Sequence, residues 1–269
     1  MEYGINLGFF AKNIGMARAA ELVAQAGFTQ LNYTPPLADE NWKQIMADHL
    51  AIFAANGLTV HQTHAPFNRY NHHGDQHLMR LQRCAEATGL MGARYMVAHG
   101  DEFNFDAQEF TPEAALEYNH DLFLPYVEAG KQAGYCVAFE TVFEDLKRRR
   151  FTSRAEELLA LIRSYDSPNA VCCWDTGHGH VSFRKQAPEL IRQFGSLIQC
   201  THVHDNAGND SHQMPTTGDI DWRATMTALR DAGYQGVISI EYSHGSMPEH
   251  MVESFLKLTA LSVQHLNTL

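Results

Sequence analysis

The eight residues Val171-Cys172-Cys173-Trp174-Asp175-Thr176-Gly177-His178 decide the fold that we expect for this chain. An apolar run with the character of a β-strand ends at an acidic residue, Asp175, and a histidine follows three positions later. In a parallel β–α unit this acid lies at the carboxyl end of its strand, where α/β barrels and open sheets carry their functional residues. The stretch therefore predicts a parallel α/β protein with its chemistry at the strand ends.

Three other apolar runs end in the same way. Cys-Val-Ala-Phe stops at Glu140, Leu-Ile-Gln-Cys-Thr stops at His202, and Val-Ile-Ser-Ile stops at Glu241. Three carboxylates and one imidazole favour Mn²⁺, Mg²⁺ or Co²⁺, and catalytic Zn²⁺ stays open as well. A single acid at a strand end is often a helix cap or a solvated loop residue, but four such residues together indicate one metal site.

Strand-like and helix-like segments alternate along the whole chain. We expect strands over residues 3–9, 28–33, 58–63, 93–98, 135–139, 170–174, 197–201 and 236–240, and helices over 15–26, 42–56, 75–90, 111–132, 153–164, 183–194, 221–231 and 248–265. Eight β–α units without a linker predict one domain over 1–269, a (β/α)₈ barrel, with a doubly wound open sheet as the alternative. Neither a G-x-G-x-x-G motif after the first strand nor a G-x-x-x-x-G-K-[ST] motif occurs, which removes the main support for a dinucleotide or P-loop protein.

The composition limits the possible partners. With 45% hydrophobic and 19% charged residues, the chain can bury a sizeable core. A net charge of −11 argues against nucleic acid and against an anionic membrane as partner. No apolar run reaches the ~18 residues of a membrane span. The first residues lack the basic region of a signal peptide, and the odd number of cysteines without C-x-x-C favours buried free thiols, so we expect a cytoplasmic protein.

The strand-end motifs also resemble a known superfamily, the xylose-isomerase-like TIM barrels, which includes 3-epimerases of free ketoses, hydroxypyruvate isomerase, isomerases of inositol catabolism and endonuclease IV. The resemblance covers the whole chain in order, through Phe139-Glu140-Thr141, Trp174-Asp175-Thr176-Gly177-His178, His202-Val203-His204-Asp205, Gly218-Asp219-Ile220-Asp221-Trp222 and Ile240-Glu241-Tyr242. It implies that Glu140, Asp175, His202 and Glu241 are metal ligands and that the two glutamates also move protons. It further implies a substrate contact for His178, and it allows a homo-oligomer.

Some assignments stay open within this resemblance. The pattern His-x-x-acid favours His202 over His204 as the ligand, with His204 nearer to solvent. The residues His64, His99, Asp210 and His212 resemble positions that hold extra metals in endonuclease IV. Loops that contact sugar hydroxyls use the same residue types, so a site with one metal and several substrate contacts is the alternative.

Two further features flank the predicted strand ends. The basic run Lys147-Arg148-Arg149-Arg150 follows the fifth strand and either meets an anionic group of the substrate or is a solvated charge run that opens a helix. Four aromatic residues lie near strand ends. Phe9 and Phe67 are candidates for a pocket wall, and Phe103 and Trp174 are better explained by core packing.

These patterns favour a metal-dependent isomerase or epimerase of a small ketose or related hydroxy-ketone. One divalent ion (Mn, Co, Mg or Zn) serves the reaction, which passes through an enediolate with Glu140 and Glu241 as acid and base, and no organic cofactor is implied. The alternatives are a multi-metal phosphoesterase on the same barrel and a lyase or dehydratase that uses the same enolate chemistry. A sugar-binding barrel without activity ranks last, because it leaves four ligands without a purpose.

Overall fold

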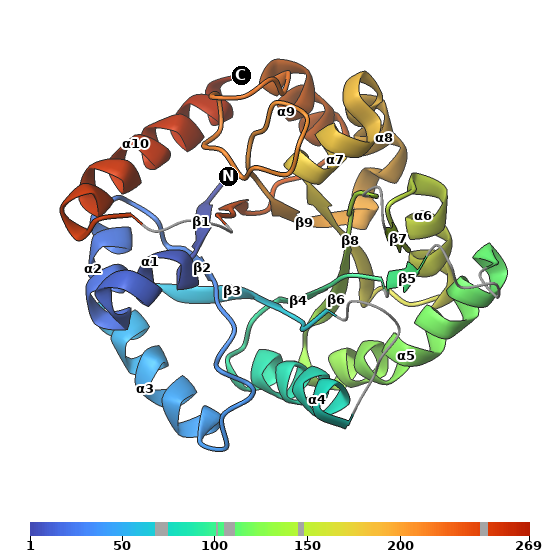
Figure 1. The fold of residues 1–269 in the computed structure, drawn as a ribbon, viewed down its shortest axis with the longest axis horizontal. Coiled ribbons are helices and arrows are strands. Elements are labelled where there is room, and N and C mark those ends of the chain that lie inside the picture. Colours follow the sequence, from blue (N-terminus) through green and yellow to red (C-terminus); the bar gives the residue numbers. More distant parts are fainter. Residues whose placement is uncertain (68–74, 101, 105–110, 145–147, 243–246) are drawn as a thin grey trace.

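The fold is a ring of parallel strands inside a ring of helices (Figure 1). A computed structural model describes residues 1–67, 75–100, 102–104, 111–144, 148–242 and 247–269. The barrel strands of this part are β1 (Tyr3–Asn6), β2 (Gln30–Asn32), β3 (Thr59–His64), β4 (Tyr95–Ala98), β6 (Cys136–Glu140), β8 (Ala170–Asp175), β9 (Ile198–His202) and β10 (Ile238–Ile240). Their order is β10-β1-β2-β3-β4-β6-β8-β9, and every neighbouring pair is parallel. The predicted (β/α)₈ TIM barrel is confirmed.

The barrel closes between β9 and β10, one residue past the end of β9. The Val203 amide donates to the Ser239 carbonyl at 2.8 Å, and the Glu241 amide donates to the Val203 carbonyl at 3.1 Å. Because the backbone of Glu241 makes a closing hydrogen bond, this residue is held beside the end of β9. The closure therefore places the carboxyl ends of β9 and β10 side by side.

The helices pack around the strands in chain order (Figure 1). In the described part they are α1 (Gly8–Ile14), α2 (Met16–Gln25), α3 (Trp42–Ala55), α4 (Asp75–Leu90), α5 (Pro112–Ala133), α6 (Ala155–Ser164), α7 (Thr176–Phe183), α8 (Ala187–Phe194), α9 (Trp222–Asp231) and α10 (Glu249–Thr268). The helix α5 has an N-cap, since the Thr111 hydroxyl accepts from the Ala114 amide and Pro112 starts the helix. No helix in the described residues is both long and apolar enough to cross a membrane.

Two predicted elements have different bounds in the structure. The first strand ends at Asn6, because the chain turns into α1 at Gly8 and buries Phe10. The range 183–194, expected as one helix, starts with the last residue of α7, continues as the 3₁₀ turn Arg184–Gln186 and becomes α-helical only in α8. Pro188 lies in the first turn of α8, and proline is compatible with a first turn but not with a helix that continues through it.

An antiparallel pair of strands stands outside the barrel, and the sequence did not predict it. The strands are β5 (Glu102–Asn104) and β7 (Arg148–Arg150), with Glu102 opposite Arg150. The expectation that the basic run opens a helix is therefore wrong for 148–150, since α6 begins only at Ala155. Residue 147 lies outside the described residues.

The barrel interior explains which side chains reach the site. Along a strand, every second side chain points to the same face. Ala138, Cys173 and Cys200 pack in the interior cluster, whereas Phe139, Cys172 and Trp174 pack toward the helices. Residues two positions beyond the interior ones must also face inward, and these are Glu140, Asp175 and His202. The predicted free thiols are confirmed, with four buried and Cys136 partly exposed.

Candidate active site

The four residues of the predicted metal shell lie together at the carboxyl end of the barrel. Glu140, Asp175 and His202 end β6, β8 and β9, and Glu241 follows β10. Each offers one ligand atom, and these atoms all lie within 4.8 Å of one another. His202 Nδ1 is 3.2 Å from a Glu140 oxygen and 3.5 Å from a Glu241 oxygen. The four side chains thus converge on one point, from separate strands. We call them the central group.

Two buried atoms of the central group lack hydrogen-bond partners. Asp175 Oδ2 and His202 Nδ1 are inaccessible to solvent, and their contacts to neighbouring groups do not have hydrogen-bond geometry. The other Asp175 oxygen accepts from the His178 amide at 2.6 Å and so caps α7. Since buried polar atoms are nearly always hydrogen-bonded, the two unpartnered atoms are what a divalent cation would satisfy. The donor set and its geometry fit such an ion.

Glu140 contacts four of the surrounding histidines. One of its oxygens lies 3.0 Å from His99 Nε2 and 3.2 Å from His64 Nε2, and the other lies 3.2 Å from the Nδ1 atoms of both His178 and His202. Burial opposes ionisation of Glu140, but the histidines, His202 and His99 first, outweigh it and hold its pKa well below the ordinary value. This carboxylate is therefore ionised, and both of its oxygens contact histidines.

The pKa values of two of these histidines shift in the opposite direction. Burial favours the neutral ring of His202, but the Glu241 and Glu140 carboxylates outweigh burial and raise the pKa of His202 to about 10. Burial likewise opposes protonation of His178, and the carboxylates of Asp175, Asp210 and Glu140 raise its pKa well above the ordinary value. Without a cation, His178 and His202 are therefore protonated at neutral pH.

Two further groups of ligand-type residues adjoin the central group. His64 and His99 meet Glu140 on one side, and His64 also comes together with His202 and Glu241. On the other side, the outer group consists of His178, His204, Asp210 and His212. Asp210 Oδ1 lies 3.1 Å from His212 Nε2 and 3.5 Å from His178 Nε2 without a hydrogen bond. All four additional candidate residues therefore lie at the same barrel mouth.

His204 differs from the expectation that it lies nearer to solvent. Its side chain is fully buried, and its Nε2 atom lies 3.1 Å from Asp175 Oδ1. Its ring stacks on that of His212 with centroids 3.8 Å apart. A Cβ atom on residue 177 would overlap the His204 ring, so Gly177 makes this burial possible. The chain continues past β9 into the barrel closure, which carries His204 inward.

One neighbour of the central group was missed by the sequence interpretation. Asn32, at the end of β2, is buried, and its Nδ2 atom lies 3.2 Å from His202 Nε2. This contact occupies one ring nitrogen and leaves Nδ1 directed at the carboxylates, in the way that outer partners orient metal-ligating histidines. The signal in the sequence is weak, since Asn32 stands among other polar residues in the strand before Pro35-Pro36.

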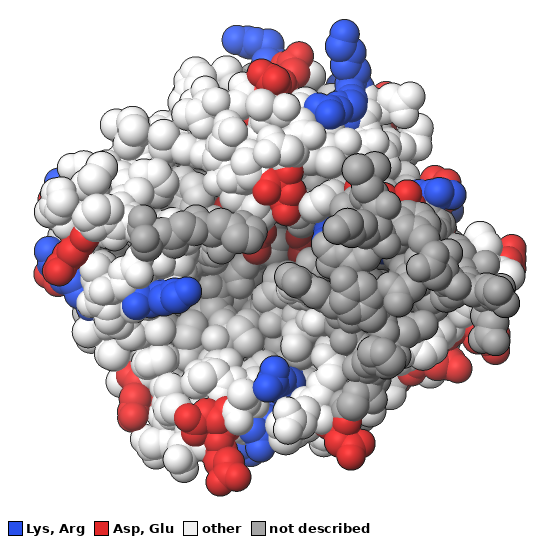
Figure 2. Space-filling model, viewed as in Figure 1, with Lys and Arg blue, Asp and Glu red and all other residues white. Residues whose placement is uncertain are grey.

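A hollow of about 890 Å³ opens beside the central group and includes His64 and Glu241 in its wall. Phe9 also lines it. Seen from this end of the barrel, the face is hollowed at its centre, and acidic side chains show inside the hollow (Figure 2). We call the hollow that is lined by Phe9, His64 and Glu241 the mouth pocket.

Of the other aromatic candidates, Phe67 borders the site and Trp174 belongs to the core. The ring of Phe67 is exposed and stacks on His99 with centroids 4.8 Å apart, so it borders the site. Trp174 is buried against Phe183 and Phe194, which is core packing. The side chain of Phe103 lies outside the described residues. Of the basic run, Arg150 lies 4.5 Å above the ring of Phe143, and that ring lies 5.2 Å from His178.

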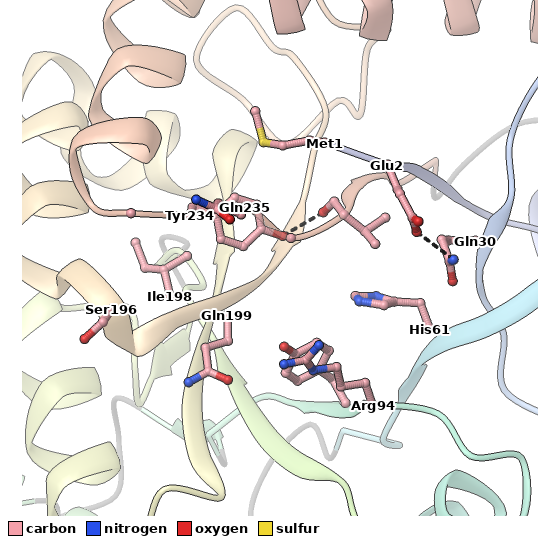
Figure 3. A pocket seen from close by; sticks show the side chains of 14 residues that line it. Met1, Glu2, Gln30, His61, Arg94, Ser196, Ile198, Gln199, Tyr234 and Gln235 are labelled. Carbon is pink, nitrogen blue, oxygen red and sulfur yellow. Dashed lines mark hydrogen bonds between the residues drawn. The ribbon is translucent and has the colours of Figure 1, made fainter.

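A second hollow lies at the amino end of the barrel (Figure 3). His61, Arg94 and Tyr234 line it, and Glu2 accepts a hydrogen bond from Gln30 there. None of the candidate site residues lies in its wall. Residues at this end of such barrels serve stability, and chemistry belongs to the opposite end.

The fold and this site define a parallel (β/α)₈ barrel with a carboxylate–histidine centre at its carboxyl end. The chain belongs to the xylose isomerase-like TIM barrel family, whose model matches residues 20–261. Among relatives, a Sinorhizobium fredii protein, y4fM, is 23% identical over 261 residues, which cover 84% of this chain and 81% of that protein. Mannonate dehydratase of Oceanobacillus iheyensis is 29% identical over 104 residues, or 36% of this chain and 29% of the enzyme.

Solved structures share the fold over the full length. A xylose isomerase domain protein from Alicyclobacillus acidocaldarius superposes with a TM-score of 0.77 at 20% identity and covers 99% of this chain and 98% of its own. D-Psicose 3-epimerase from Clostridium cellulolyticum H10 gives 0.76 at 15% identity, covering 99% of both chains. The 3-keto-D-glucoside 4-epimerase from E. coli gives 0.76 at 16% identity, covering 100% of both. At these identities the comparison establishes the fold.

Proposed function

We propose that this protein is a metal-dependent isomerase or epimerase of a small ketose or related hydroxy-ketone. The observation that carries the proposal is the central group, in which four ligand atoms from four strand ends lie within 4.8 Å and two of them are buried without a partner. The similarity in fold to sugar epimerases supports the same assignment. An open pocket beside the group provides room for a substrate.

The central group would hold one divalent ion through Glu140, Asp175, His202 and Glu241. Such an ion supplies Lewis-acid polarisation of a carbonyl and its neighbouring hydroxyl. Glu241 lines the mouth pocket, and its side chain is 15% exposed, whereas that of Glu140 is 1% exposed. Glu241 is therefore the carboxylate that a substrate in the mouth pocket meets directly. Proton removal from carbon falls to one glutamate and proton delivery to the other, with His178 orienting substrate hydroxyls.

Removal of the metal tests this proposal. Protein that has been stripped with a chelator should lose its activity on a panel of free ketoses and related hydroxy-ketones, and Mn²⁺ or Co²⁺ should restore it. Asp175→Ala and His202→Ala should lower both metal content and rate, while His265→Ala, at an exposed position on α10, serves as the matched control. Full turnover by thoroughly metal-free protein would sink the proposal.

The groups that flank the central one favour a second candidate, a phosphoesterase with several metals. His64 and His99 share Glu140 with the central group, and the outer group adds four more ligand atoms within 4.8 Å. Elemental analysis separates the candidates. About one metal per chain supports the isomerase. Two or three per chain, with the extra ions lost in His64→Ala or His212→Ala, and hydrolysis of a phosphate ester would support the phosphoesterase.

A further inference from the structure

The mouth pocket has an uneven distribution of charge. Its wall contains one carboxylate, Glu241, and one primary amine, Lys12. Glu241 and His64 come from strand ends, whereas Lys12 lies in the last turn of α1, and His49, also in the wall, lies on α3. The pocket thus extends from the central group to the helices that follow β1 and β2.

Most polar side chains in this wall are already engaged by the protein. The Asn6 amide group both donates to and accepts from the Tyr242 backbone. The Thr34 hydroxyl donates to the His64 carbonyl and accepts from the His64 amide. Asn32 contacts His202. Apart from the metal-type residues, the groups that remain for a ligand are Lys12 and the pair formed by Tyr33 and His49.

Lys12 has no ion-pair or hydrogen-bond partner for its ammonium group within the described residues. A cation in the last turn of a short helix also stabilises the carbonyl end of that helix. That role needs no pocket, however, and the pocket wall around Lys12 carries no acid other than Glu241. Lys12 is exposed, and an anion bound beside it would meet a positive charge with which no carboxylate of the described residues pairs.

The Tyr33–His49 pair adds a hydrogen-bond donor. Tyr33 Oη lies 2.7 Å from His49 Nδ1. Burial raises the pKa of Tyr33 and lowers that of His49, so both rings are neutral at pH 7. The two neutral rings have one N–H and one O–H between them, and only one of these is used in their mutual bond. Whichever tautomer forms, one donor of the pair remains.

We propose that the substrate carries a terminal anionic group, a phosphate or a carboxylate, which Lys12 binds with the help of the Tyr33–His49 pair. This inference rests on the proposed function and names the substrate class, a ketose phosphate or a keto-sugar acid. The carbonyl end of the molecule lies at the central group, and Phe9 and Tyr242, with ring centroids 5.5 Å apart, wall the path between the ends. Charge-assisted contacts of this kind change affinity about 10- to 100-fold.

The test is a calorimetric titration of metal-loaded protein with polyols that cannot be isomerised. D-Glucitol, D-glucitol 6-phosphate and L-gulonate share one carbon chain and differ only at C6, which carries a hydroxyl, a phosphate or is a carboxylate. We expect one of the two charged compounds to bind about 10- to 100-fold more tightly than the neutral one. The compound that binds more tightly shows whether the site prefers a phosphate or a carboxylate. In Lys12→Gln this advantage should fall to about one, and in Lys12→Arg most of it should remain, since the charge is kept.

Lys43→Gln is the matched control, because Lys43 is an exposed lysine on α3 outside the pocket wall. It should keep the full advantage of the charged polyol. Equal binding of all three compounds by the parent protein would overturn the inference. Tighter binding of the charged compound that persists in Lys12→Gln would overturn it too, since the anion would then bind the metal and not Lys12. Turnover of neutral ketoses without any preference for charged ones would leave the proposed function standing and refute only this inference. Lys12-dependent anion binding without any turnover of ketoses would support the anion site and refute the proposed function.

Discussion

The two glutamates of the central group meet their surroundings differently, although the sequence places both at strand ends. Glu140 contacts four histidines and is buried, whereas Glu241 borders the mouth pocket. Each would touch a planar enediolate from one side only. We expect Glu140→Gln and Glu241→Gln to lose about 10²–10⁴-fold in the chemical step. We also expect at least one of them to exchange the substrate's carbon-bound proton with solvent while giving little product.

Mass spectrometry of substrate and product in D₂O measures this exchange, and the metal content of both variants has to be determined alongside, because both residues are proposed ligands. Two variants that keep their metal and turn over at the parent rate would rule out the mechanism with two glutamates. If both variants exchange the carbon-bound proton only as fast as they form product, the proposed division of labour between the two glutamates is wrong.

Proton release is a second prediction at the residue scale. Because the pKa of His202 is raised to about 10, its ring is protonated at neutral pH without a cation. A metal needs the free Nδ1 lone pair, so binding must displace about one proton at pH 7, and affinity must rise with pH up to the pKa. Calorimetry in buffers of different ionisation enthalpy counts the released protons. Affinity that does not vary between pH 6 and 8, with no proton release, would contradict the role of His202.

The strand-end residues were predictable because strand ends have a clear pattern, a continuous apolar run that stops at a polar residue. Glu140, Asp175 and His202 follow that pattern directly. The burial of His204 did not follow from it, because the closing contact between Val203 and Ser239 joins distant parts of the chain. Asn32 was missed for a related reason, since its importance comes from a contact with a residue 170 positions away.

At the scale of elements, the turn from β8 into α7 holds the central and outer groups together. Asp175 caps α7, His178 lies in its first turn, and Gly177 leaves room for the His204 ring. Gly177→Ala should therefore push His204 out of place and destabilise the fold by about 1–3 kcal/mol, as overpacking does. Gly8→Ala is the control, because open space surrounds that position in α1. Thermal melts measure both, and an unchanged melting temperature in Gly177→Ala would show that His204 is not fixed by this contact.

Element order was predicted well, and the exceptions have physical causes. All eight barrel strands lie within predicted ranges or extend them by one residue, because parallel strands are continuous apolar runs. The antiparallel pair β5 and β7 was not predicted, since a short strand rich in arginine has the composition of a solvated loop. The α-helix expected from residue 183 begins only at Ala187, because Pro188 fits the first turn of a helix and not its interior.

On the scale of the whole molecule, the net charge of −11 and the acidic hollow at the barrel mouth belong together. A negative surface disfavours a polyanion such as DNA, while a cation in the hollow offsets the local charge. If the central group binds a metal, metal-loaded protein should melt at a higher temperature than stripped protein, by an amount that grows with free Mn²⁺. The gain should be smaller in Asp175→Ala, which still folds cooperatively because barrel-end residues serve function more than packing.

We expect one metal ion among Glu140, Asp175, His202 and Glu241, and anomalous diffraction from crystals grown with Mn²⁺ would locate it. A strong anomalous peak should lie between these four side chains, within bonding distance of Asp175 Oδ2 and His202 Nδ1, the two buried atoms that lack partners. A map without a peak there, or with a peak only among His178, His204, Asp210 and His212, would contradict this expectation.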